Sequence, residues 1–258
     1  MAISTFKKHV FAVVAGIALA MGVASSAQAS EFTVNPSALG GVKESFTAVQ
    51  MDGSSSERLV TNADGSRTGS GYIKYTAFED SSFEQIFMID GYRLYALFSF
   101  TEVDAPNSPR NSILTSLSYT LWGDILRDDI FHPSIGSNSN ATVGGGTAND
   151  IALGSGSLIY GDSSFPASGG VTLGATTTFH ITAAGSNFFK GPLPFFTATS
   201  NSFSNTAFSG SVVNSDGSVS INSPGSTSFN NPIPEPTSVA LFGLGLLGLS
   251  AGFRRRKN

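Results

Sequence analysis

Residues 92–100 are Tyr-Arg-Leu-Tyr-Ala-Leu-Phe-Ser-Phe, and this stretch decides the fold class. Successive side chains of a β-strand point to opposite faces of the sheet, so alternate residues share a face. One face here is apolar or aromatic throughout: Tyr92, Leu94, Ala96, Phe98 and Phe100. The other face is mixed: Arg93, Tyr95, Leu97 and Ser99. A strand covered on one side and partly covered on the other is expected near the centre of a sheet.

Other short apolar stretches predict further strands along the chain. Residues 71–78 and 117–121 are strand candidates, and residues 176–182 should place Phe179 and Ile181 inward. The runs 151–153 and 158–160 flank Gly-Ser-Gly-Ser, which predicts either a bulged strand or a tight hairpin. Asp216-Gly217 lies between 211–213 and 219–221 and predicts a hairpin turn.

The strand pattern predicts an all-β domain over residues 30–221, built as an antiparallel β-sandwich or jelly roll. Residues 134–150 are rich in Ser, Asn, Gly and Thr and are expected to form a long surface loop. Residues 222–233 lack an apolar period and are expected to be a flexible spacer. No spacing of strands and helices indicates a parallel sheet.

The first 29 residues have the order of a secretory signal peptide. Lys7 and Lys8 precede the apolar run 10–23, and Ala-Gln-Ala at 27–29 is a small-residue cleavage site. Cleavage between Ala29 and Ser30 would leave Ser30 at the mature N-terminus. An uncleaved N-terminal helix is the alternative, and the cleavage site argues against it.

Residues 234–258 combine three distinct pieces. Pro234-Glu235-Pro236 is followed by an uncharged apolar stretch over residues 239–253, and a basic group ends the chain: Arg254, Arg255, Arg256 and Lys257. The 15 apolar residues are fewer than the roughly 20 that a full membrane span needs. We expect a short transmembrane helix whose basic end stays in the cytoplasm.

This tail resembles the PEP-CTERM sorting signal of Gram-negative bacteria. The resemblance implies that an exosortase, a membrane-embedded cysteine peptidase-transferase, recognises Pro234, Glu235 and Pro236 and removes the tail. Residues 239–253 would then hold the protein in the membrane only transiently. An ordinary C-terminal anchor is the alternative, although a plain anchor needs neither the Pro-Glu-Pro motif nor a Gly-rich helix.

The charge and cysteine content limit the possible partners of the middle domain. Of the 14 Lys and Arg, six lie in the terminal signals, as does one of the 18 Asp and Glu, which leaves eight cations, 17 anions and a net charge of −9. An acidic surface disfavours nucleic acid and is compatible with cation-bridged contacts to acidic polysaccharide. With no cysteine, the protein has neither disulfide bonds nor a thiol nucleophile.

Asp124, Asp128 and Asp129 form the best candidate cluster for chemistry. A calcium site or a carboxylate pair for glycoside hydrolysis are its functional interpretations, but EF-hand spacing is absent and acidic turns are common on exported proteins. His132 and His180 have no partners at metal-ligand spacing. We therefore predict no catalytic residue, no cofactor and no metal ligand, and leave calcium binding by the three aspartates open.

The Phe-rich segment 188–196 allows two interpretations. Two Phe pairs frame Pro192 and Pro194, so the segment is either an exposed adhesive patch or part of the core. The chain has 21 Phe against one Trp and six Tyr, and surfaces that meet a wet ligand favour Trp and Tyr. Most of the Phe residues are therefore expected in the core.

The middle of the chain is similar to the flocculation-associated PEP-CTERM proteins. The similarity rests on the segments Gly71-Tyr72, Tyr92–Ala96 and Gly185–Phe189 with the prolines that follow. It implies a non-enzymatic surface or matrix protein that promotes cell aggregation with exopolysaccharide. The alternatives are a secreted carbohydrate-binding or carbohydrate-active module and a structural protein O-glycosylated on its many Ser and Thr.

Overall fold

The computed structural model describes residues 30–230, apart from residues 83, 107, 166–170, 192–196 and 205–210. The expected signal peptide and sorting segment, with their two expected helices, lie outside the described residues. Within the part of the chain that is described, no helix is both long enough and apolar enough to cross a membrane.

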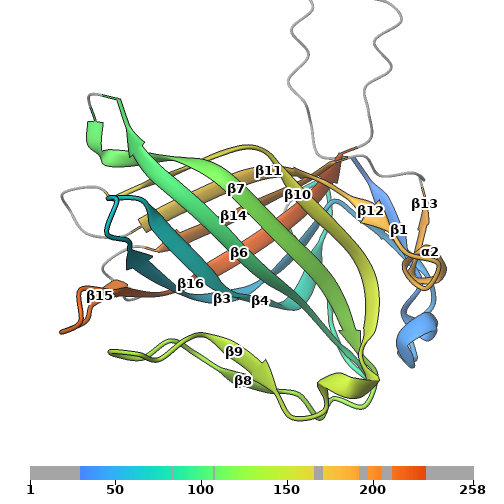
Figure 1. The fold of residues 1–258 in the computed structure, drawn as a ribbon. Helices are drawn as coiled ribbons and strands as arrows, with labels where there is room; N and C mark the ends of the chain where they lie inside the picture. The colour runs from blue at the N-terminus through green and yellow to red at the C-terminus, as the bar shows by residue number, and fades with distance from the viewer. Residues whose placement is uncertain are drawn as a thin grey trace, which may run out of the picture. The chain divides into compact units, whose positions relative to one another are not determined.

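Strands make up most of the described chain (Figure 1). Three short helical turns accompany them: η1 (Pro36–Leu39), η2 (Thr147–Asn149) and α2 (Gly185–Phe188). The strands are β1 (Phe32–Val34), β2 (Phe46–Ala48), β3 (Gln50–Thr61), β4 (Arg67–Glu79), β5 (Gln85–Met88), β6 (Arg93–Ala105), β7 (Ser108–Asp124), β8 (Ile130–His132), β9 (Thr142–Gly144), β10 (Ile151–Ser164), β11 (Val171–Thr178), β12 (His180–Ile181), β13 (Phe189–Gly191), β14 (Thr197–Ser204), β15 (Ser211–Val213) and β16 (Val219–Asn230).

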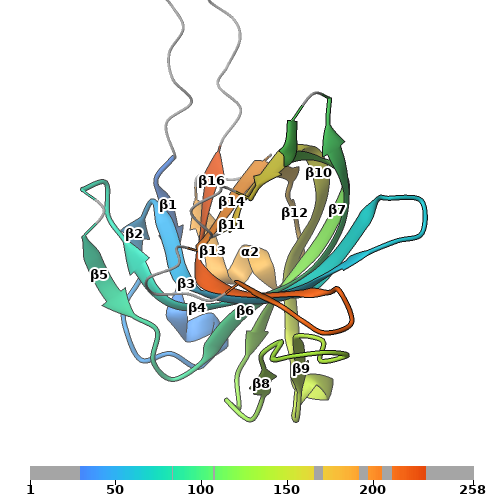
Figure 2. The same cartoon turned by 90° about the vertical axis from the view of Figure 1, so that its left-hand side faces the viewer.

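Eight strands close into an antiparallel barrel, so the expected sandwich or jelly roll is wrong. The order around the sheet is β11-β14-β16-β3-β4-β6-β7-β10, and β10 pairs again with β11. This last pairing extends from Leu158 opposite Thr177 to Ser164 opposite Thr172 and leaves the ring without free edges. Figure 2 looks along the barrel, with its strands arranged around the axis.

Alternating side chains fill the barrel. In β4, Gly69, Ile73 and Tyr75 are buried whereas Ser70 and Thr76 are exposed. The β6 strand lies between β4 and β7, which confirms the expected central position of residues 92–100. Its buried positions include Leu94, Ala96 and Phe100, as the alternation predicts.

Aromatic residues pack at one end of the barrel, where β1, β13 and α2 lie (Figure 1). The ring centroid of Phe229 is 4.8 Å from that of Phe179 and 5.2 Å from that of Phe189. Phe188 and Phe189 have no exposed surface, so the first Phe pair of the 188–196 segment belongs to the core. The second pair lies outside the described residues.

The expected spacer at 222–233 is instead part of the barrel as far as residue 230. β16 pairs with β14 on one side and with β3 on the other. Its inward side chains include Ser223 and Thr227, which are 5% and 3% exposed. Ser223 Oγ lies 2.8 Å from Ser55 Oγ, and Thr227 Oγ1 lies 2.7 Å from Tyr75 Oη. Hydroxyl pairs thus allow a polar sequence to occupy the barrel interior.

The predictions of local turns agree with the structure more closely than the prediction of the spacer does. β15 and β16 form the expected hairpin, and Gly217 has the φ of 78° that its turn requires. Residues 151–164 form one continuous strand with irregular register, which favours the bulge over the hairpin. The expected loop 134–150 contains two short elements, β9 and η2. We call residues 130–144, which comprise β8, β9 and their connection, the strap.

Candidate functional site

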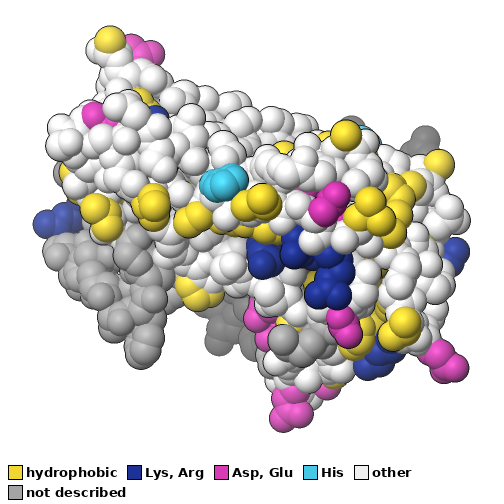
Figure 3. All heavy atoms as spheres, turned by 90° about the horizontal axis from the view of Figure 1, so that it is seen from below, with side chains coloured by type: hydrophobic (Ala, Val, Ile, Leu, Met, Phe, Trp, Pro, Cys, Tyr) yellow, Lys and Arg dark blue, Asp and Glu magenta, His cyan; other side chains and the backbone are white. Residues whose placement is uncertain are grey.

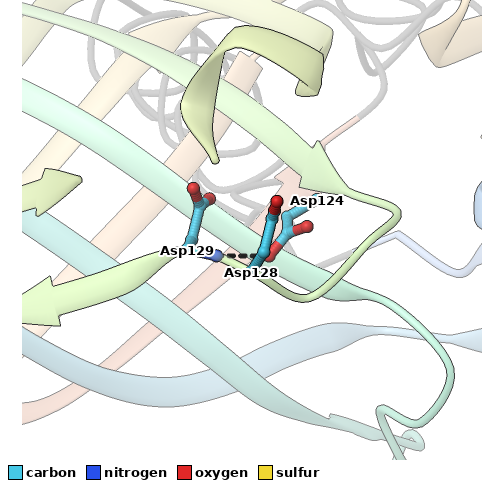
Figure 4. A group of neighbouring side chains, drawn as sticks. All are labelled: Asp124, Asp128 and Asp129. Carbon is cyan, nitrogen blue, oxygen red and sulfur yellow. Dashed lines mark hydrogen bonds between the residues drawn. The ribbon is translucent and has the colours of Figure 1, made fainter. Parts of the chain in front are cut away.

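Asp124, Asp128 and Asp129 come together at the base of the strap, as Figure 4 shows. Asp124 is the last residue of β7, and the other two directly precede β8. One oxygen from each carboxylate lies within 4.8 Å of those of the other two. The turn between β7 and β8 therefore brings three negative charges into one place.

Asp124 is the best-partnered member of this cluster. Its side chain is fully buried and accepts hydrogen bonds from the backbone N–H of Arg127 at 2.5 Å and of Asp129 at 3.4 Å. The guanidinium of Arg93 lies 3.6 Å from its second oxygen. Asp124 therefore organises the turn, as a carboxylate that accepts backbone N–H groups commonly does.

Asp129 has the opposite environment. It is 4% exposed, and within the described part of the chain neither carboxylate oxygen accepts a hydrogen bond of normal geometry. The Asp150 side chain lies so close that a hydrogen bond between the two carboxyls would require a proton on one of them. Burial raises the pKa of Asp129 to about 7, with contributions from the charges of Asp150, Asp124 and Asp128.

Asp150 lies beside Asp129 at the edge of the cluster, and the sequence analysis did not identify it. It directly precedes β10, and its Oδ2 accepts a hydrogen bond from Tyr95 while its Oδ1 has no partner. Asp150 is 21 positions from Asp129, and no spacing motif connects them. The antiparallel pairing of β10 with β7 brings them together, because Ile151 lies opposite Gly123.

The exposed member, Asp128, is held by the segment that follows β9. Asn149 Nδ2 donates to its Oδ2 at 3.4 Å, and a side-chain carbon added at Gly146 would overlap its carboxylate. His132 and His180 are both exposed and do not belong to the cluster. Within the described residues, the cluster therefore offers oxygen ligands alone.

A second candidate site is a groove on the outer face of β3, β4, β6 and β7. Its volume is about 450 Å³, within the size range of ligand-binding pockets. We call it the outer groove. Its lining is Arg58, Val60, Thr68, Gly69, Ser70, Ser99, Phe100, Thr101, Ser116, Leu117, Ser118 and Asn140.

Hydroxyl groups cover the floor of the outer groove in rows across the strands. The strand register places Ser70 opposite Ser99, and Ser99 opposite Ser118. The next row places Thr68 opposite Thr101 in the same way. Ser99 Oγ and Ser118 Oγ are 3.2 Å apart. Each hydroxyl can both donate and accept, so this surface suits a partner that carries many hydroxyl groups.

The strap forms one wall of the outer groove. Arg58 donates to Asn140 Oδ1 at 3.0 Å and forms an ion pair with Asp216 at 2.7 Å. Ser134 is buried at the start of the connection between β8 and β9. Its backbone N–H donates to Ser56 Oγ, and its hydroxyl shares a hydrogen bond with the hydroxyl of Ser220. The underside of the strap is apolar where Phe131 contacts the rings of Tyr72 and Tyr95.

On the face that carries the strap, Lys and Arg side chains gather near the middle with Asp and Glu side chains beside them (Figure 3). Most of this face consists of uncharged polar side chains, glycine and backbone. By contrast, the cavity inside the barrel is apolar and measures about 30 Å³, which accommodates little more than a water molecule. A polysaccharide would therefore have to bind outside the barrel.

Comparison with known proteins identifies the C-terminal segment. Residues 232–257 match the PEP-CTERM protein-sorting motif, so the chain carries the signal that its tail resembles. This motif marks a protein for exosortase processing and for export and sorting to the cell surface or extracellular space. No curated protein and no solved structure matches the chain. The match covers the tail and none of the barrel.

Proposed function

We propose that the protein is a non-enzymatic surface or matrix protein that promotes cell aggregation by binding exopolysaccharide. The observation that carries the proposal is the outer groove, with its rows of Ser and Thr hydroxyls beside the guanidinium of Arg58. Sugar rings present hydroxyl groups at regular intervals, and a hydroxylated sheet face can exchange hydrogen bonds with several of them at once. The sorting motif agrees with a location where such polymers occur.

A substitution in the floor of the outer groove tests this proposal in cells. Ser99 and Ser118 face each other on neighbouring central strands, and both are exposed. Replacing both with Gln would fill the floor without adding charge. Ser155→Gln is the matched control, because Ser155 is also an exposed strand residue but lies outside the groove.

The measurements are the settling rate of cells and the amount of polysaccharide recovered with the protein. In a strain that lacks the chromosomal copy, we expect the wild type and Ser155→Gln to restore settling and the double Gln variant to fail. Unchanged settling in the deletion strain itself would contradict a role in aggregation. Normal polysaccharide recovery with the double Gln variant would contradict the outer groove as the binding surface.

Measuring the length of the polymer distinguishes the proposed binding protein from the alternative of a carbohydrate-active enzyme. The purified full chain is incubated with the polysaccharide of the same organism, and the polymer is sized at intervals. Binding with constant polymer length supports the proposal. Progressive shortening would overturn its non-enzymatic part and favour hydrolysis.

A further inference from the structure

We propose that Asp124, Asp128 and Asp129 bind one Ca²⁺ ion at the base of the strap, with Asp150 beside Asp129 adding negative charge. This inference goes beyond the proposed function and does not depend on it, because it concerns the acidic cluster and leaves the partner of the outer groove open. It rests on the charge balance of the cluster, on its unpartnered buried oxygens and on the types of its ligand atoms.

The charge balance of the cluster is strongly negative. Four carboxylates lie there. Among the described ion pairs, the cation that contacts them is Arg93, which lies 3.6 Å from Asp124. Arg127 lies in the same turn, but its guanidinium faces Asp90 at 3.5 Å. The carboxylates of the cluster repel each other strongly, because they lie close together in a buried site. A further cation would relieve most of this repulsion.

Among the described residues, three carboxylate oxygens at the cluster accept no hydrogen bond of normal geometry, although the Tyr95 hydroxyl lies close to Asp129. They are both oxygens of Asp129 and Oδ1 of Asp150, and each is inaccessible to solvent. Asp129 is 4% exposed, and one of its carboxylate oxygens lies within 4.8 Å of oxygens of Asp124 and Asp128. A buried carboxylate without a donor is costly, and proteins normally supply a hydrogen bond, a counter-charge or a metal. The backbone around Asp129 is occupied in other bonds, since its carbonyl accepts from Arg93.

The ligand atoms and their separation favour Ca²⁺. Calcium takes six to eight oxygen ligands at about 2.3–2.6 Å, so the ligands of one ion lie within about 5 Å of each other. The three oxygens contributed by Asp124, Asp128 and Asp129 lie within 4.8 Å. Asp128 is exposed, which leaves room for water molecules to complete the coordination. Zinc would instead favour His or Cys ligands.

The bound ion would join both ends of the strap to the barrel. Asp124 ends β7, Asp129 precedes β8, and Asp150 precedes β10. The strap between them supplies Asn140 to the wall of the outer groove. Calcium would therefore order the strap, in addition to the Phe131 ring contacts and the Ser134 hydrogen bonds that already hold it.

Direct titration tests the site. The full chain is purified in detergent, stripped with EDTA and titrated with CaCl₂ by calorimetry. We expect one Ca²⁺ per chain with a dissociation constant of about 10⁻⁴–10⁻³ M, the range of extracellular calcium modules. Terbium provides a second signal, because Tyr95 contacts Asp150 and can transfer excitation energy to an ion bound there. Calcium should displace terbium and quench the emission.

Two variants and one control locate the binding. Asp129→Asn removes one ligand charge while keeping the shape of the side chain, and Gly146→Ala displaces the Asp128 carboxylate without changing any acid. Each should weaken calcium binding by about tenfold or more, because ligand charge and placement determine the affinity. Asp162→Asn, an exposed aspartate of β10, should leave it unchanged.

Three results would contradict the calcium proposal. If the folded wild type, checked by circular dichroism, gives neither heat with calcium nor sensitised terbium emission, the proposal is wrong and a shared proton holds Asp129 and Asp150 together. Wild-type affinity in Asp129→Asn would also overturn it, as would equal affinity for Mg²⁺.

Discussion

Glu57 and Glu102 are both buried in the barrel, but only Glu102 has bonding partners. Glu57 is 1% exposed, and neither of its carboxylate oxygens has a hydrogen-bond partner. Glu102 accepts from Arg67 Nε at 2.7 Å and from Ser163 Oγ at 2.6 Å. Burial, together with the charge of Glu102, raises the pKa of Glu57 from 4.5 to about 8. Glu57 is therefore neutral in the folded protein at pH 7.

The raised pKa of Glu57 predicts that stability falls as the pH rises. Above its ordinary pKa of 4.5 the side chain ionises in the unfolded chain, whereas in the folded chain it stays protonated up to about pH 8. The folded state thus binds more protons in this interval. The stabilising contribution is complete below the unfolded pKa and is lost as the pH rises through the folded pKa. Urea unfolding at several pH values measures this slope.

Glu57→Gln should reduce this pH dependence. The neutral amide removes the linked proton, so the variant should be more stable than the wild type at about pH 8 and nearly equal to it at about pH 5. Glu79 and Asp129, whose pKa values are both raised to about 7, contribute with the same sign in both proteins, so the difference between the two slopes belongs to Glu57. Parallel curves for the two proteins would contradict the prediction.

The buried ion pair of Arg67 and Glu102 predicts non-additive substitutions. Arg67→Met should destabilise the protein by about 3–5 kcal/mol, because it leaves the fully buried Glu102 without its counter-charge. The double variant Arg67→Met/Glu102→Leu should recover much of this loss, since no unpaired charge remains inside. Denaturation of the wild type, both single variants and the double variant measures the coupling. Additive losses would show that the pair does not act as a unit.

The sequence predicts several of the strands from their local alternation, but it provides no candidate for β3 or β14. Residues 71–78 and 92–100 lie within or overlap β4 and β6, and the Asp-Gly turn forms between β15 and β16. Barrel closure could not be predicted in this way. It depends on the pairing of β10 with β11, and local alternation is the same whether a strand belongs to a sandwich or to a barrel.

Residues 222–230, the greater part of the last barrel strand, were missed for a different reason. A strand is normally recognised by an apolar inward face, but β16 places Ser223, Gly225 and Thr227 on that face. They are buried because other strands supply matching groups, such as Ser55 for Ser223 and Tyr75 for Thr227. A polar segment whose partners are more than 150 positions away has the same local pattern as a linker.

The residues of the candidate sites also differ in whether the sequence alone identifies them. The sequence identifies three of the aspartates, Asp124, Asp128 and Asp129, because they lie in one turn. It does not identify Asp150, because only strand pairing brings this residue close to the others. The outer groove had no signal at all in the sequence. Its hydroxyl rows come from three strands, β4, β6 and β7, and each strand taken alone shows only the ordinary alternation of polar outward residues.

Close packing inside the barrel predicts that Gly71→Ala is destabilising. A side-chain carbon at Gly71 would overlap the carbonyl oxygen of Ser56 and the Cα of Glu57, and backbone atoms cannot move aside cheaply. We expect a loss of about 1–3 kcal/mol in the free energy of unfolding. Gly191→Ala is the control, because among the described residues no atom beyond its chain neighbours lies within 4 Å of the added carbon, and it should change stability by less than about 0.5 kcal/mol. Equal effects of the two would refute the packing argument.

The sorting motif predicts that processing depends on Glu235 and on the basic end of the chain. Residues 232–257 carry the PEP-CTERM signal, in which Pro234-Glu235-Pro236 precedes the apolar stretch and Arg254–Arg256 follow it. Glu235→Ala should remove the side chain that we expect the exosortase to recognise. Replacing the three arginines with Ser should remove the charges that keep the end of the chain on the cytoplasmic side. Both variants should accumulate as full-length precursor in the membrane fraction, whereas Glu31→Ala, an exposed glutamate at the start of the barrel domain, should be processed normally. Mass spectrometry of the C-terminus distinguishes the outcomes, and a normally trimmed end in both tail variants would show that these residues do not direct sorting.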